Sequence, residues 1–116
     1  MPAKAYLVES EIDAMTLWQM DCPAIAIGGA NLSERQRTLL LQSPIQHVIL
    51  ATDNDLAGQR IAQSVWQQLN GYLSITQLQL PEHVKDVNEL SRTELEWVIQ
   101  KEKNLLIWNS VLHPNI

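Results

Sequence analysis

The chain has 116 residues, and 46% of them are hydrophobic, which is enough for one soluble domain with a single core. Thirteen acidic against eight basic residues give a net charge of −5, and the lysines and arginines are scattered, which argues against tight unaided binding to nucleic acid. The single cysteine excludes an internal disulfide framework, and no stretch has the pattern of a signal peptide or a membrane span. We expect a cytoplasmic domain without a membrane partner.

Apolar runs and helical spacing alternate along the chain. Short apolar runs predict strands over 5–8, 24–27, 47–51 and 74–80. Helical spacing and capping residues predict helices over 11–20, 33–41, 56–69, 86–90 and 91–104. Since the chain has no phenylalanine, we expect its four tryptophans to share the core with Leu, Ile and Val. The alternation predicts an α/β fold, a compact and mainly parallel four-stranded sheet flanked by helices.

The organisation of the chain is that of one domain. We assign it to residues 1–104, because no linker, repeat or low-complexity segment interrupts them. Residues 105–116 form an apolar C-terminal tail, which we expect to pack back on the domain or to contact a partner.

Polar residues gather where the predicted strands end. Glu9 and Asp13 follow the first strand, Gly28-Gly29 the second and Asp53-Asn54-Asp55 the third, and the fourth leads into Lys85-Asp86-Val87-Asn88. In parallel sheets, ligands bind off the carboxyl ends of the strands, so these segments should converge. Converging carboxylates repel one another unless a hard cation such as Mg²⁺ neutralises them. The sequence therefore predicts a divalent-metal site.

Simpler interpretations exist for each segment. Asp55 is suited to cap the helix that begins at Leu56, and Glu9 with Glu11 could interact with the dipole of the first helix. Gly28-Gly29 could be a phosphate-approach turn or only a tight turn. A second carboxylate at Asp53 adds repulsion without adding a second cap, which favours the metal interpretation.

Four segments together resemble the Toprim domain of primases, topoisomerases and some nucleases. They read VESEIDAMTL, AIAIGGANLS, VILATDNDLAGQRIA and LPEHVKDVNEL, and they are most similar to the primase and primase–helicase branch. One departure is Ser10, which stands where the family usually has glycine next to its glutamate.

The resemblance implies a role for each matching residue. It implies catalytic roles for Glu9 and Asp13 and metal binding, of Mg²⁺ or Mn²⁺, by Asp53, Asp55 and Asp86. It implies close helix packing at Gly58, and we take Gly28, Gly29, Lys85 and Asn88 as candidate substrate-binding residues. The implied activity is nucleotidyl transfer, as in primer RNA synthesis during DNA replication. Nucleic acid and nucleotides would bind weakly to this chain alone, and other domains or subunits of a replication or repair protein would assist.

Three other functions stay open. The same site could cut phosphodiesters, as small Toprim nucleases do. A phosphoacceptor signalling domain also combines a parallel sheet with acids and a lysine, here Lys85, at the strand ends. A non-catalytic Toprim fold could serve protein contacts, which the apolar tail favours. The chain could be a fragment of a primase-like protein or a small stand-alone one.

Overall fold

A parallel four-stranded sheet forms the centre of the structure, a computed structural model that describes the backbone of residues 3–112 and the side chains of residues 3–102. The strands are β1 (Ala3–Val8), β2 (Ala24–Ala26), β3 (Ile45–Leu50) and β4 (Ser74–Gln77). Their order is β2-β1-β3-β4, and all three pairings are parallel. The predicted fold class is confirmed.

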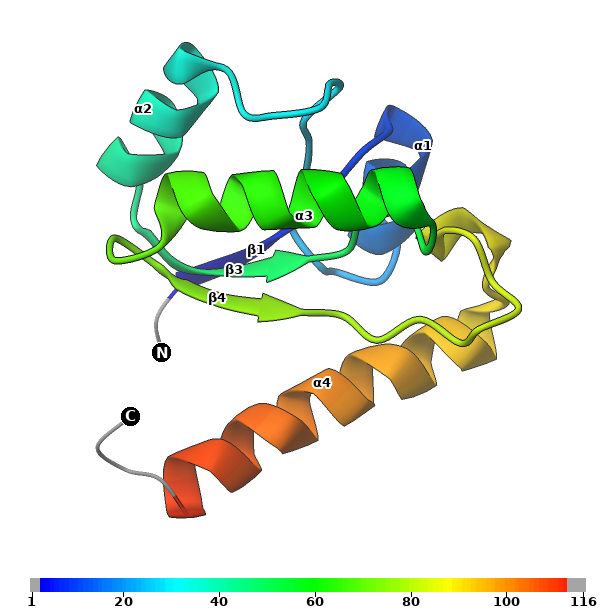
Figure 1. Cartoon of the computed structure of the whole chain (residues 1–116). Coiled ribbons are helices and arrows are strands. Elements are labelled where there is room, and N and C mark those ends of the chain that lie inside the picture. The colour runs from blue at the N-terminus through cyan, green and yellow to red at the C-terminus, as the bar shows by residue number, and fades with distance from the viewer. Residues whose placement is uncertain (1–2, 113–116) are drawn as a thin grey trace.

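Helices cover both faces of this sheet (Figure 1). They are α1 (Glu11–Trp18), α2 (Glu34–Gln42), α3 (Leu56–Leu69), the short 3₁₀ helix η1 (Val87–Glu89) and α4 (Arg92–Leu112). Helices α2 and α3 lie over one face, and α4 runs beneath the other (Figure 1). All connections between the strands pass through a helix, as parallel pairing requires.

Strands β1 and β3 contribute side chains to two separate cores, because successive side chains of a strand point to opposite faces of the sheet. Tyr6 and Ile49 pack with α1, η1 and α4 on one face. Leu7, Val48 and Leu50 pack with α2 and α3 on the other. Burial on both faces explains why the central strands are continuously apolar in the sequence.

A buried polar chain fixes α4 against the sheet. The Glu102 carboxylate accepts a hydrogen bond of 3.1 Å from the Thr76 hydroxyl, which also lies 2.8 Å from Nε2 of His47. Glu102 and His47 are both buried. The described part of α4 is thereby tied to β3 and β4.

The expected end of the last helix is wrong. The last helix was expected to end near Asn104 but continues to Leu112, because residues 105–112 contain neither glycine nor proline and so nothing in them interrupts a helix. Its backbone therefore includes most of the tail, whose side-chain contacts lie outside the described residues.

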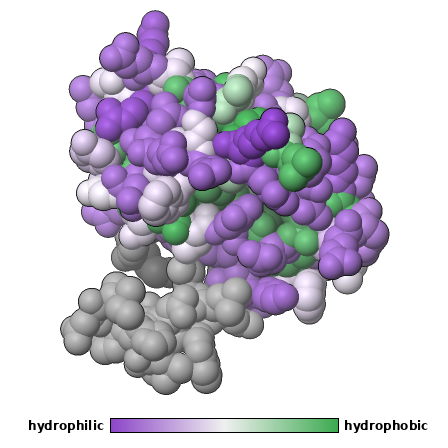
Figure 2. Space-filling model, in the orientation of Figure 1, coloured by the Kyte–Doolittle hydropathy of each residue, from purple (hydrophilic) through white to green (hydrophobic). Residues whose placement is uncertain are grey.

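Three tryptophans are exposed rather than buried. The exposed fractions are 56% for Trp18, 45% for Trp66 and 61% for Trp97, while Trp108 lies outside the described side chains. The Trp18 indole reaches the carbonyl of Ala24 from the rim of the core, which leaves much of its ring in water. On the face drawn in Figure 2, residues of high hydropathy form small areas among hydrophilic ones. No helix in the described part of the chain is long and apolar enough to cross a membrane.

Candidate metal centre

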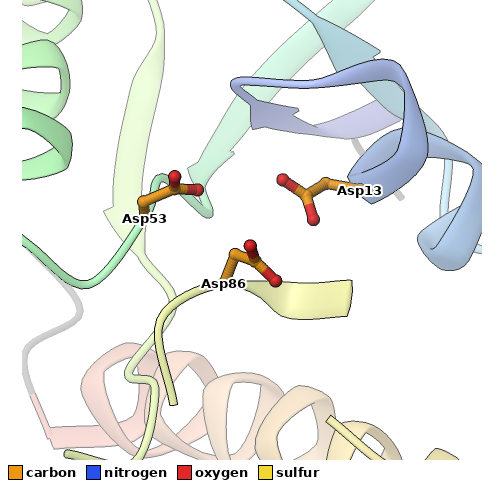
Figure 3. Close-up of side chains that lie close together, drawn as sticks. All are labelled: Asp13, Asp53 and Asp86. Atoms are coloured by element: carbon orange, nitrogen blue, oxygen red, sulfur yellow. The ribbon is translucent and has the colours of Figure 1, made fainter. Parts of the chain in front are cut away.

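Three carboxylates from distant parts of the chain meet at the carboxyl end of the sheet. Asp13 comes from α1, Asp53 from the loop after β3, and Asp86 from the residue before η1. One oxygen of each lies within 4.8 Å of the others. Figure 3 shows the three side chains pointing toward a common centre. We call this set the acidic cluster.

Asp53 is held by the end of β1 and by the first turn of α3. Its backbone N–H donates a hydrogen bond to Oε2 of Glu9, across the β1–β3 pair. Gly58 lies against its backbone, and a Cβ at that position would overlap the carbonyl oxygen of Asp53. The loop can therefore approach the helix closely only because residue 58 lacks a side chain.

Asp13 is oriented by the cap of its own helix and by η1. The Ser10 hydroxyl accepts a hydrogen bond from the Asp13 N–H and lies 3.0 Å from Oδ2 of Asp13. The Asn88 N–H donates to Oδ1 of Asp13 at 3.2 Å. Ser10 is extended, with φ of −114°, so serine fits this position without strain and supplies the N-cap that glycine would lack.

A loop contact brings Asp86 to the other two acids. The Asn54 side-chain amide donates to the carbonyls of Pro81 and Val84, each at 3.1 Å, and its backbone N–H donates to the carbonyl of Lys85. These bonds fasten the segment before Asp86 to the loop that carries Asp53. Asp86 itself accepts a hydrogen bond from the Glu89 N–H as the N-cap of η1.

The acidic cluster carries an electrostatic penalty. Burial, then the neighbouring charge of Glu9 and a hydrogen bond with it, raise the pKa of Asp53 to about 7, and the charges of Asp13 and Asp86 act in the same direction. Burial also raises the pKa of Asp13, against the opposing hydrogen bond with Ser10. The buried Oδ1 of Asp53 has no hydrogen-bond partner among the described residues.

These observations fit a divalent cation. Between described side chains, the ion pairs are His83–Glu94 and Arg92–Glu96, so neither supplies a positive charge to the acidic cluster. Carboxylate oxygens are the ligands of Mg²⁺ and Mn²⁺. A cation would compensate the repulsion and give the unpaired oxygen of Asp53 a partner.

The other predicted site residues have different surroundings. Asp55 caps α3, since its Oδ1 accepts a hydrogen bond of 2.7 Å from the Gly58 N–H, and it is not a member of the acidic cluster. Glu9 adjoins Asp53 through the hydrogen bond described above. Gly28 has a left-handed backbone with φ of +70°, and its N–H donates to the carbonyl of Glu9.

Of the remaining candidates, Lys85 and Asn88 contact the site through their backbones, and Gly29 has no recorded contact with it. Gly29 is exposed and follows Gly28 in the turn after β2. Lys85 is exposed and joins the loop contact through its carbonyl. Asn88 binds Asp13 by its N–H, and its side chain accepts a hydrogen bond from Thr16.

Two positioning residues were missed from the sequence. Asn54 was treated as the spacer between two aspartates, yet its side chain makes the loop contact. Ser10 was treated only as a departure, although Ser10-x-x-Asp13 has the spacing of a helix cap, which could have identified it.

Comparisons with known proteins identify a family and several similar structures. The model of the Toprim-like family matches residues 6–91. An uncharacterized Mycoplasma pneumoniae protein, the MG010 homolog, is 35% identical over 89 residues, which span 73% of this chain and 41% of that protein.

Solved structures agree with this match. The primase fragment of the bacteriophage T7 primase-helicase is 25% identical with a TM-score of 0.66, over 87% of this chain and 44% of that one. The Aquifex aeolicus primase is 25% identical with a TM-score of 0.67, over 85% of this chain and 26% of that one. A small TOPRIM domain protein from Bacillus stearothermophilus shares the fold at 13% identity, with a TM-score of 0.63, over 89% of this chain and 87% of that one.

The chain thus spans less than half the length of the curated relative and of these two primases. The family match covers most of the chain, including all four strands except the first residues of β1, and all three acids of the cluster. The chain therefore belongs to the Toprim-like family.

Proposed function

We propose that this chain is a divalent-metal-dependent nucleotidyl-transfer module of the primase type. The observation that carries the proposal is the convergence of Asp13, Asp53 and Asp86 without a compensating positive side chain among the described residues. Such an arrangement is costly for the fold and is expected where a cation completes it.

Each acid has a separate part in this proposal. Asp53 and Asp86 would hold Mg²⁺ or Mn²⁺ together with Asp13, whose orientation depends on Ser10 and Asn88. When bound, the cation would neutralise phosphate oxygens and align the attacking and leaving oxygens. Glu9 positions the backbone of Asp53 and is the candidate acid or base at the edge of the site.

The size of the chain bears on how it would work. Both primases to which it is similar are more than twice as long as the part it matches. The chain is also acidic, with a net charge of −5, so it offers little general attraction for a phosphate backbone. We propose that other domains or subunits of a replication protein supply the grip on the template.

Two assays on the same protein test the proposal. In the first, ribonucleoside triphosphates, Mn²⁺ and a short single-stranded DNA are incubated with the chain, and dinucleotide formation is measured. In the second, nicking of supercoiled DNA is measured under the same conditions. We expect slow, Mn²⁺-dependent dinucleotide formation that Asp53→Asn abolishes.

Asp21→Asn is the matched control, because Asp21 is an exposed aspartate in the turn after α1 and its left-handed backbone tolerates asparagine. Phosphodiester cleavage is the second candidate, because a metal ion held by the converging Asp13, Asp53 and Asp86 could also activate water for attack on a phosphodiester. Nicking that depends on Asp53, without dinucleotide formation, would assign the site to cleavage. Absence of both activities together with absence of metal binding would favour an interaction module.

A further inference from the structure

A polar pocket adjoins the acidic cluster on the side of β4. Its volume is about 240 Å³, and it is lined by Thr52, Asp53, Asn54, Gln59, Gln77, Leu78, Gln79 and Leu80. Strand β3, which leads to Asp53, lies between β1 and β4. The pocket is on the β4 side of Asp53, since residues 77–80 line it, whereas Asp13 belongs to α1, which follows β1. Asp53 is the one residue shared by the pocket and the acidic cluster. A ligand with phosphates at the cluster can therefore extend into the pocket.

Two oxygens at this pocket lack partners. Thr52 is only 5% exposed, and its Oγ1 is buried without a hydrogen bond to any described residue. The Oδ1 atom of the next residue, Asp53, is also buried without a hydrogen bond to any described residue. Buried polar atoms in folded proteins are nearly all paired, so a partner from outside the chain is expected here. The cation at the acidic cluster would take the Asp53 oxygen, which leaves the Thr52 hydroxyl. This hydroxyl can both donate and accept a hydrogen bond, so a hydroxyl of the ligand would suit it.

The remaining lining indicates which part of a ligand the pocket suits. Gln59, Gln77 and Gln79 are exposed, and the described structure records no hydrogen bond from their side-chain amides. Each amide offers two donors and an acceptor. None of the described residues that line the pocket is aromatic, so they offer a nucleobase no stacking surface. A sugar with adjacent hydroxyls matches this set of groups better than a base does.

We propose that this pocket binds the ribose of a nucleotide whose phosphates lie at the acidic cluster, and that Thr52 hydrogen-bonds one hydroxyl of the ribose diol. The proposal rests on the proposed function, because the metal site is what brings the nucleotide there. It adds to that function a place in the structure, this pocket and Thr52, where the ribose hydroxyls would be recognised. Thr52 is thus a specificity residue and not a metal ligand.

Calorimetry with four probes tests the proposal. The probes are inorganic triphosphate, ATP, 2′-deoxyATP and 3′-deoxyATP, each in the presence of Mn²⁺. For the wild type we expect ATP to bind about fivefold to tenfold more tightly than at least one deoxy analogue, the difference given by one hydrogen bond. In Thr52→Val that difference should disappear, while triphosphate binding stays unchanged.

The variants separate a lost contact from a lost fold. Valine has nearly the shape of threonine, and the Thr52 hydroxyl has no partner in the chain, so Thr52→Val should melt at or above the wild-type temperature. Gln79→Ala changes an exposed lining residue and should also reduce the preference for ATP. Gln67 is exposed on α3 outside the pocket, so Gln67→Ala is the control and should leave the preference for ATP unchanged.

Two results would overturn the ribose proposal alone. In one, ATP and both deoxy analogues bind the wild type equally; in the other, the preference survives in Thr52→Val. In both cases triphosphate would still bind with Mn²⁺. If triphosphate fails to bind the wild type, the proposed function fails, and the ribose proposal fails with it.

Discussion

Asp53 is the residue at which burial and like charges act most strongly on the site. Its pKa is raised to about 7, first by burial and then by Glu9, so the folded chain holds the proton more tightly than the unfolded chain does. The resulting stabilisation of the fold is fully present below pH 3.8, the ordinary pKa of an aspartate, and is lost as the pH rises through about 7. Metal binding must displace this proton, so it should strengthen over the same range.

We therefore expect the metal-free chain to lose stability between pH 4 and about 7, and its affinity for Mn²⁺ to rise between pH 6 and 8. Thermal unfolding in EDTA across this range, with Asp53→Asn as the reference, isolates the effect of this group. The variant should gain stability relative to the wild type as the pH rises. A constant difference between the two proteins would contradict the assignment.

The two aspartates of Asp53-Asn54-Asp55 have different surroundings, Asp53 in the acidic cluster and Asp55 at the start of α3. Its side chain caps α3, and asparagine is as good an N-cap as aspartate. Asp55→Asn should therefore keep both stability and Mn²⁺ binding, whereas Asp55→Ala should lower the free energy of unfolding by about 1 kcal/mol. Chemical denaturation and calorimetry measure the two properties. Loss of Mn²⁺ binding in Asp55→Asn would restore the metal-ligand role that the sequence implies.

The convergence of the carboxylates could be predicted from the sequence, whereas the hydrogen bonds that orient them could not. Parallel strands end at one edge, which is why Glu9, Asp53 and Asp86 could be expected to converge. Whether Glu9 or Asp13 points into the cluster depends on the hydrogen bonds of Ser10 and Asn88, and no spacing rule contains these.

The packing of α3 on the β3 loop depends on Gly58. A Cβ there would overlap the Asp53 carbonyl oxygen and lie 2.7 Å from its carbonyl carbon. Gly58→Ala should lower the free energy of unfolding by roughly 1–3 kcal/mol, although alanine in an unobstructed helix position is more favourable than glycine. It should also weaken Mn²⁺ binding, because the loop must move away from the helix.

Gly29→Ala is the control for this change. Gly29 has no positive φ, and the nearest atom to an added Cβ is 4.0 Å away. Denaturant titrations of both variants give the comparison. Equal stability of Gly58→Ala and the wild type would show that the loop and α3 tolerate a wider separation than the structure has.

The strands and helix starts could be predicted because they have local causes. The capping boxes at Ser33 and Ser91 form as their spacing indicates. The exposure of Trp97 depends on which face of α4 meets the sheet, and that is set by packing between distant segments. Helical spacing identifies a helix but does not say which of its apolar residues will meet the sheet.

The acidic balance of the chain governs how it meets nucleic acid. With a net charge of −5 and no cluster of basic residues in the sequence, few phosphate contacts are available. We expect no detectable binding of single-stranded DNA or RNA in EDTA, and weak binding with a shallow salt dependence in Mn²⁺. Fluorescence anisotropy at several salt concentrations measures both. Tight, steeply salt-dependent binding in EDTA would contradict this expectation, because it would require a basic surface that the scattered lysines and arginines do not predict.

A calorimetric Mn²⁺ titration tests most directly whether Asp13, Asp53 and Asp86 form a metal centre. The proteins compared are the wild type, Asp53→Asn and the exposed control Asp21→Asn, at pH 8. We expect saturable binding to the wild type and to Asp21→Asn, and its loss in Asp53→Asn. Equal binding by all three, or none by the wild type, would contradict the metal centre and the proposed activity together.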